Sequence, residues 1–268
     1  MMGIVTLLLA VVIGGSLFLA LRNDFDEDIG HFAVGSPFFT VFVIGAVLAV
    51  LMGVGAAIAA KKKGMDLPAP LAEGFAARLP DCAAAVSALV FFVMELLDLI
   101  RSGTYTLPAI GELVFLPGIA LFFLFGVLPS FRGGRLHGAA GIAACLSVNC
   151  LLFRSYFDFT LPLNSPIRNV LVVMEAAYLL ALLVVTGNIL GKATPSACYF
   201  VRCAAVSLMG GMALGLILAA LFASDSVPHG VSILRCVLVF FSAAAVLFHP
   251  FNKKTTQQIS TTGESIHE

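Results

Sequence analysis

Long apolar stretches separated by short polar connections recur eight times along the chain. Each is about 20 residues long, enough for an α-helix rising 1.5 Å per residue to cross a hydrocarbon core of about 30 Å. The pattern therefore predicts an all-α fold, a polytopic transmembrane helix bundle. The expected spans are residues 3–21, 37–60, 81–101, 108–128, 138–157, 166–190, 203–223 and 230–249. They form a membrane domain over residues 1–252, and the polar tail at 253–268 is expected to be cytoplasmic and disordered.

The composition agrees with a protein whose main solvent is lipid. Hydrophobic residues make up 60% of the chain and charged residues only 11%, too few for a soluble domain. The formal net charge is zero, which gives no broad attraction to nucleic acid, so the lipid bilayer is the expected partner. The first apolar segment has no basic leader and no small-x-small cleavage pattern, and we interpret it as a span. Cleaved as a signal peptide, it would leave seven spans and an N-terminus outside the cell.

The distribution of lysine and arginine between the loops predicts the orientation of the bundle. One set of loops holds ten of these residues and the opposite set holds five. Cytoplasmic loops normally carry the excess, so we expect a cell membrane protein with both termini in the cytoplasm. The ten residues are Lys61, Lys62, Lys63, Arg78, Arg132, Arg135, Lys192, Arg202, Lys253 and Lys254.

The longest connection on the expected cytoplasmic side, residues 61–80, allows two interpretations. Leu71, Phe75 and Leu79 recur every four residues, which is typical of a short helix lying on the membrane surface. The alternative is a plain connector restricted by its prolines.

Two spans carry small residues at every fourth position. Helices in lipid associate through close van der Waals contact, so such a series predicts a face where a neighbouring backbone approaches. These faces could pack within the chain or support a homo- or hetero-oligomer, and the alternative is chance in helices rich in glycine and alanine. The series are Gly45, Ala49, Gly53 and Ala57 in span 2, and Ser207, Gly211, Gly215, Ala219 and Ala223 in span 7.

A weak internal repeat relates the two halves of the chain. Arg22 and Arg154 each open an R-x-x-F-D segment at the end of an odd-numbered span, 132 residues apart. Ser-Pro pairs open spans 2 and 6, with Pro37 and Pro166 129 residues apart. An offset of four spans predicts a parallel 4+4 duplication, an arrangement that some transporters use. Matches this short also arise by chance.

Ionisable residues inside the spans gather toward the expected outer side. A charged group in hydrocarbon costs a few kcal/mol, so such residues normally face a partner or a water-filled cavity. The inner halves of the same helices carry nothing similar in the sequence pattern. The candidate binding residues are Glu95, Asp98, Arg101, Glu112, Arg154, Asp158, Arg168, Glu175 and Arg235.

This distribution predicts a polar cavity that opens to the outside. Glu95 and Glu175 lie deepest and would form its bottom, where buried carboxyl groups could exchange protons. The rim would consist of Arg101, Arg154, Arg168 and Arg235. The alternative is structural. The rim arginines could reach the membrane interface, and the pairs Asp98–Arg101 and Arg154–Asp158 would then only neutralise each other.

Motifs of catalysis and metal binding are absent from the sequence. No H-E-x-x-H, G-x-S-x-G or phosphate-binding loop occurs, so we expect neither an enzyme nor a cofactor. The acidic loop that starts at Asp24 resembles a calcium loop, but Ile29 replaces the required glycine and Gly35 replaces the closing glutamate. The six cysteines form no CxxC pair and are expected to be small buried residues, with no metal site.

The segment Tyr156–Pro166 reads Y-F-D-F-T-L-P-L-N-S-P. It resembles a loop of uncharacterised multi-pass membrane proteins of Clostridia-type bacteria, in which Y-x-[DN]-x-x-x-P-x-N-x-P joins two spans. The likeness extends over about 45 residues, to Gly191-Lys192 and Tyr199. The resemblance implies a bacterial cytoplasmic membrane and assigns no activity.

Two classes of function fit these features. The first is a carrier or channel-like protein for a small polar solute or ion, with Glu95 and Glu175 at its binding site. The second is a non-transporting sensor, or an accessory subunit of a membrane complex whose partner binds at spans 2 and 7. The two classes differ in whether neutralising the deep carboxylates stops solute flux.

Overall fold

The computed structural model describes residues 2–26, 30–69, 71, 74–103, 105–157, 165–223 and 231–251. Asp158 and the tail over 253–268 lie outside these residues, as does most of the segment that carries the family resemblance. The helices are α1 (Met2–Asp24), α2 (Pro37–Lys63), α3 (Leu79–Ser102), α4 (Leu107–Val127), α5 (Arg135–Tyr156), α6 (Pro166–Ile189), α7 (Pro195–Phe200), α8 (Val206–Phe222) and α9 (Ile233–Phe248). A π-helical turn, η1 (Val201–Ala205), joins α7 to α8. A short hairpin of β1 (Phe25–Asp26) and β2 (His31–Phe32) follows α1.

The all-α prediction is confirmed, and each of the eight expected spans corresponds to a helix or, for span 7, to the continuous run α7–η1–α8. Seven of these helices are long and apolar enough to cross a membrane. The eighth, α9, has 16 helical residues, about 24 Å at the usual rise, and is shorter than a full span. Several helices begin at proline as expected, and the Ser36 side chain caps α2 by accepting from the Phe39 N–H.

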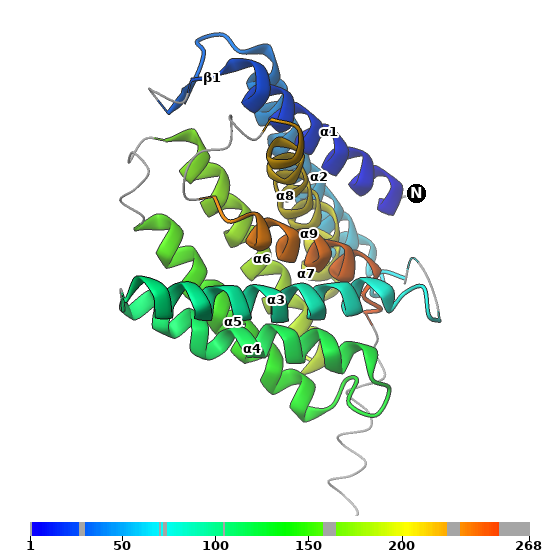
Figure 1. Cartoon of the computed structure of the whole chain (residues 1–268). Helices are drawn as coiled ribbons and strands as arrows, with labels where there is room; N and C mark the ends of the chain where they lie inside the picture. The colour runs from blue at the N-terminus through cyan, green and yellow to red at the C-terminus, as the bar shows by residue number, and fades with distance from the viewer. Residues whose placement is uncertain are drawn as a thin grey trace, which may run out of the picture.

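The helices form two groups joined by a pair in between. Helices α1, α2 and α8 pack together, α4 packs on both α3 and α5, and α6 and α9 connect the groups (Figure 1). Helix α9 packs on both α3 and α8, while α6 packs on both α5 and α8. No finding bears on the proposed 4+4 duplication, which stays a prediction.

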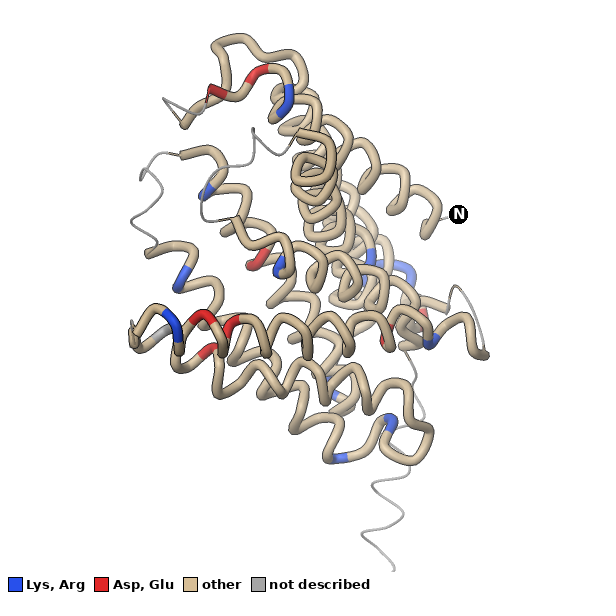
Figure 2. The backbone as a smooth tube through the Cα atoms, in the orientation of Figure 1, with Lys and Arg blue, Asp and Glu red and all other residues tan. Residues whose placement is uncertain are grey.

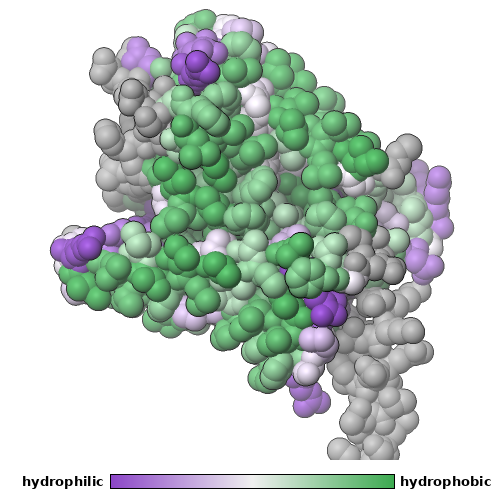
Figure 3. Space-filling view, turned by 45° about the vertical axis from the view of Figure 1, so that its right-hand side comes forward, coloured by the Kyte–Doolittle hydropathy of each residue, from purple (hydrophilic) through white to green (hydrophobic). Residues whose placement is uncertain are grey.

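The surface between the two ends of the bundle is apolar. Figure 3 shows hydrophobic residues spread over the flanks of the helices, with hydrophilic residues gathered at the margins. Large aliphatic side chains on the outward faces of α2 and α3 are exposed, including Leu51, Val54, Val86 and Leu89. Only lipid can cover such a surface at low cost, so the chain is a multi-pass membrane protein.

The connection between α2 and α3 is irregular in its described part. Residues 64–69, 71 and 74–78 form turns and bends, without a regular helix among them. Leu71 packs against the start of α1, where its side chain lies 2.7 Å from a Cβ built on Gly3, and Phe75 is exposed. Over these residues the expected surface helix is therefore wrong, and the connector interpretation fits.

The small-residue face of span 7 packs against α1. A Cβ built on Gly211 would lie 2.8 Å from the Ala10 carbonyl oxygen, and one on Gly215 would lie 2.8 Å from that of Gly14. In α2, a Cβ on Gly53 would lie 2.5 Å from the Cβ of Ala204. The prediction of close-packed faces is confirmed, since only glycine permits these approaches. Because the chain's own helices cover the central parts of both faces, they do not offer an oligomer a free surface.

Two adjacent glycines of α1 provide a matched test of this packing. A Cβ on Gly14 would lie 2.7 Å from the Gly211 carbonyl oxygen, whereas one on Gly15 would meet nothing within 4 Å. We expect Gly14→Ala to lower the free energy of unfolding by about 1–3 kcal/mol, because α1 must move away from α8. Gly15→Ala should be neutral or stabilising by up to about 1 kcal/mol. Unfolding in mixed detergent–SDS micelles would compare them, and equal effects would refute the tight contact.

Candidate functional site

Five helices bring charged side chains together at one end of the bundle. The set consists of Glu95 on α3, Glu112 on α4, Arg154 on α5, Glu175 on α6 and Arg235 on α9. We call this set the charged network. The end of the bundle where α3 and α5 finish and where α4, α6 and α9 begin is called the network end. Figure 2 shows acidic positions of α3 and α4 side by side there.

Arg154 joins the two carboxylates that belong to neighbouring helices. Its Nη1 donates to Glu95 Oε2 at 2.5 Å and to Glu112 Oε2 at 3.1 Å. The Arg154 side chain is 40% exposed and that of Glu95 is 15% exposed, but the Glu112 side chain is buried, with only 1% exposed. The guanidinium therefore separates a buried carboxylate from the surface.

The next residue of α5, Ser155, belongs to the second half of the charged network. Its Oγ donates to Glu175 Oε1 at 2.9 Å and accepts from Arg235 Nη1 at 2.8 Å. Arg235 Nη1 also contacts Glu175 Oε1 at 2.9 Å. The Glu175 side chain is fully buried and that of Arg235 is 7% exposed, so this ion pair is shielded from solvent.

The two halves act on one another electrostatically, because Glu112 lies within range of Arg235 as well as Arg154. Within the charged network, three carboxylates face two guanidinium groups. Two buried oxygens, Oε1 of Glu112 and Oε2 of Glu175, have no hydrogen-bond partner. A buried unpaired carboxylate is costly, so this arrangement favours binding of one further proton or cation.

The structure gathers some of the predicted residues and separates others. Glu95 and Glu175 do not contact each other directly, but they join the same set through consecutive residues of α5. Asp98 and Arg101 are exposed at the end of α3, outside the charged network. Arg168 is buried on α6, two turns before Glu175.

Arg235 was expected on the exposed rim of the cavity, but it does not lie there. It is buried against Glu175, because α9 packs between α3, α6 and α8 and its first turn is covered. Arg154 binds Glu95 and Glu112, which belong to other helices. The i,i+4 spacing had suggested Asp158 as its partner, and Asp158 lies outside the described part of the chain.

The expectation that the opposite ends of these helices lack ionisable groups is wrong. Asp81 and His137 are buried there, and the Nε2 atom of His249, just after α9, is inaccessible. Arg202 of η1 is buried at the same end, where it donates to the His249 carbonyl oxygen. Each lies within three residues of a helix end or at the π-helical turn, where sequence position alone suggests contact with water. They are buried because the helices cross at these positions. The only signals in the sequence were Pro80 beside Asp81 and Gly138 beside His137, which are residue types common at the start of a helix.

Metal-binding geometry is not found in the part of the chain that the structure describes. No three His, Cys, Asp or Glu side chains there lie close enough together to hold an ion. All six cysteines are free, four of them buried. The chain matches no known protein-family model, and no curated protein or solved structure is significantly similar to it. It is a multi-pass membrane protein whose family is not identified.

Proposed function

We propose that the protein is a membrane carrier for a small cation or a small cationic solute, with the charged network as its binding site. The observation that carries this proposal is the excess of carboxylates over guanidinium groups in the charged network, with one buried oxygen each on Glu112 and Glu175 that has no hydrogen-bond partner. Ionisable residues at membrane depth are typical of solute and proton pathways.

Access would come from the side of Arg154, the most exposed member of the charged network. A cation that approaches Glu95 competes with Arg154 for the carboxylates, because the guanidinium uses one nitrogen for both contacts. Displacement of Arg154 would open the way to Glu112. The loop charges favour an outer location for the network end, and solute would then enter from outside.

Proton-coupled flux into liposomes tests this proposal. The purified protein is reconstituted with the pH-sensitive dye pyranine inside, and gradients of Na⁺, K⁺, ammonium and methylammonium are imposed in turn. We expect at least one cation to change the internal pH faster than in empty liposomes. Glu95→Gln and Glu175→Gln should abolish that flux, because each removes a charge that binds the cation.

Asp98→Asn is the matched control, because Asp98 lies one turn from Glu95 on α3 but is exposed outside the charged network. It should transport like the wild type. The proposal fails if the wild type moves none of the four cations, or if folded Glu175→Gln protein transports normally.

The alternative, a sensor or accessory subunit, has less support. Its partner was expected at the small-residue faces of spans 2 and 7, which are packed within the chain.

A further inference from the structure

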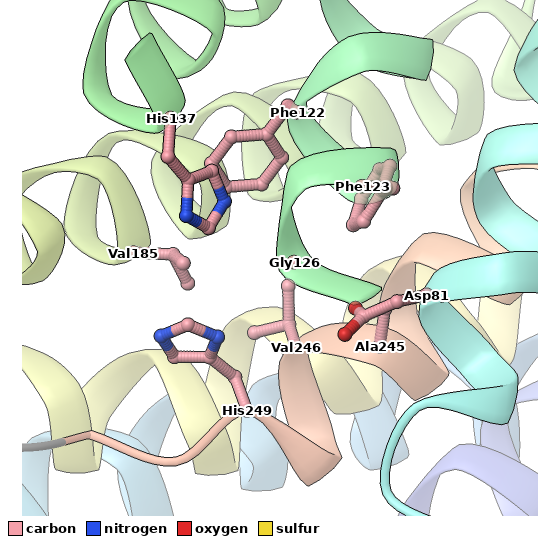
Figure 4. A pocket seen from close by; sticks show the side chains of 9 residues that line it. All are labelled: Asp81, Phe122, Phe123, Gly126, His137, Val185, Ala245, Val246 and His249. Atoms are coloured by element: carbon pink, nitrogen blue, oxygen red, sulfur yellow. The ribbon is translucent and has the colours of Figure 1, made fainter. Parts of the chain in front are cut away.

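A second polar site lies at the opposite end of the five helices that carry the charged network. A small cavity there has room for about one water molecule. Its polar lining comes from Asp81 on α3, His137 on α5 and His249 just after α9, and α4, α6 and α9 complete the wall (Figure 4). We call it the polar cavity.

Asp81 is the acidic group of the polar cavity. It lies in the first turn of α3, is only 7% exposed, and receives no hydrogen bond from any residue that the structure describes. Gly126 of α4 makes room for it, because a Cβ there would lie 3.2 Å from Asp81 Oδ2. The carboxyl group therefore faces the polar cavity, where a water molecule or a proton can reach it (Figure 4).

Two histidines face Asp81 across the polar cavity. The Nδ1 atom of His137 accepts from the Gly133 N–H at 3.2 Å, while Nε2 of His249 is buried without a partner. Burial, together with the nearby Arg132, His137 and Arg202, lowers the pKa of His249 to about 3. His249 is thus neutral at physiological pH and offers a ring nitrogen to a water molecule.

The charges around the polar cavity are few. Arg132, in the connection between α4 and α5, acts on Asp81, His137 and His249, and Arg202 of η1 acts on His249. The lining residues of α4, α6 and α9 are uncharged. A carboxyl group in such surroundings is suited to gain and lose a proton as its hydration changes.

Polar groups also recur between the two sites. On α9, Arg235 and Ser242 lie seven residues apart on one face, and His249 follows seven residues later, just after the helix. Ser242 Oγ donates to Tyr178 Oη at 2.9 Å in the buried interval between α9 and α6. On α3, Asp81 and Glu95 lie 14 residues apart on one face, about 21 Å along the helix.

We propose that Asp81, with His249 and one water molecule, forms a second proton-binding site at the far end of the helices that carry the charged network. A proton from bulk water binds an Asp81 carboxylate oxygen and returns to water through the polar cavity, with no other bond made or broken. As an exit for coupled protons, the site rests on the proposed function. As a protonated carboxyl group, it can be measured independently.

Infrared spectroscopy of the purified protein in lipid tests the site. The C=O stretching band of a protonated carboxyl group is followed as the pH is raised. We expect Asp81→Asn to remove one titrating band from the wild-type spectrum, and Asp98→Asn to leave that band in place. Gly126→Ala should shift the frequency or the midpoint of the Asp81 band, since it places a methyl group against the carboxyl oxygen.

Loss of the band in Asp81→Asn and its shift in Gly126→Ala support the proposal. Unchanged carboxyl bands in folded Asp81→Asn protein overturn it. If Asp81→Asn does not fold, an unshifted spectrum of Gly126→Ala overturns it instead. Failure of the carrier proposal can be told apart from failure of the proton site. Normal flux in Glu175→Gln protein whose Asp81 band is intact would contradict the proposed carrier site and leave the proton site supported.

Discussion

Replacement of Arg235 by methionine is expected to destabilise the protein by about 3–5 kcal/mol, the usual cost of removing one partner of a buried ion pair. Arg235 Nη1 binds both Glu175 and Ser155, and the Glu175 side chain is fully buried. Methionine fills much of the arginine stem but supplies no donor. Glu175 would then remain as an unpaired charge among five helices, and its electrostatic cost would appear in the free energy of unfolding.

The variant Glu175→Gln in the Arg235→Met background separates this mechanism from a packing defect. Removing the second charge should recover most of the lost stability, because a neutral amide costs less to bury than a carboxylate. Arg101→Met serves as control and should change stability by no more than about 0.5 kcal/mol, since Arg101 is exposed. A double variant as unstable as Arg235→Met alone would contradict the ion-pair account. Unfolding by SDS in mixed micelles provides all four values.

Replacement of Arg202 by methionine should cost about 3 kcal/mol, because hydrogen bonds from a charged donor contribute about 1.5–3 kcal/mol each. The buried guanidinium donates to the carbonyl oxygen of Ala69 and, at 2.7 Å, to that of His249. It also lies 5.1 Å from the ring centre of Phe251. Arg202 thus fastens the α2–α3 connection and the segment after α9 to the π-helical turn.

Limited proteolysis distinguishes this role from a general loss of packing. Arg202→Met should expose the α2–α3 connection to trypsin at Arg78 well below the temperature of global unfolding. Arg202→Lys should show a smaller effect, because an ammonium group can satisfy one carbonyl but lacks the planar geometry to reach both. Equal cleavage rates in the wild type and Arg202→Met would show that Arg202 does not fasten the connection.

The helices could be predicted from sequence because lipid imposes their length and apolarity locally. Each span follows from about 20 consecutive residues, and no distant contact is needed to recognise it. The close approach of α1 and α8 could be predicted only in part. Gly211 and Gly215 indicated a groove on α8, but not which helix packs into it. Gly14, the matching position on α1, carries no comparable series in its own helix.

The partners of the charged side chains could not be predicted, because they come from helices distant in sequence. Arg154 is separated by 59 residues from Glu95 and by 42 from Glu112. Sequence spacing favours pairs within one helix, such as Arg154–Asp158, and contains no information on which helix faces which. The polar cavity was missed for a related reason: Asp81 and His249 lie at helix ends, and only the crossing of α3, α4 and α9 buries them.

Cation binding to the charged network can be measured most directly as charge displacement on a solid-supported membrane. A concentration jump of the cation that gives flux in liposomes should produce a transient current with wild-type protein. The same jump should give no current with Glu175→Gln and a normal current with Asp98→Asn. A wild-type current in folded Glu175→Gln protein would contradict the assignment of the charged network as the binding site.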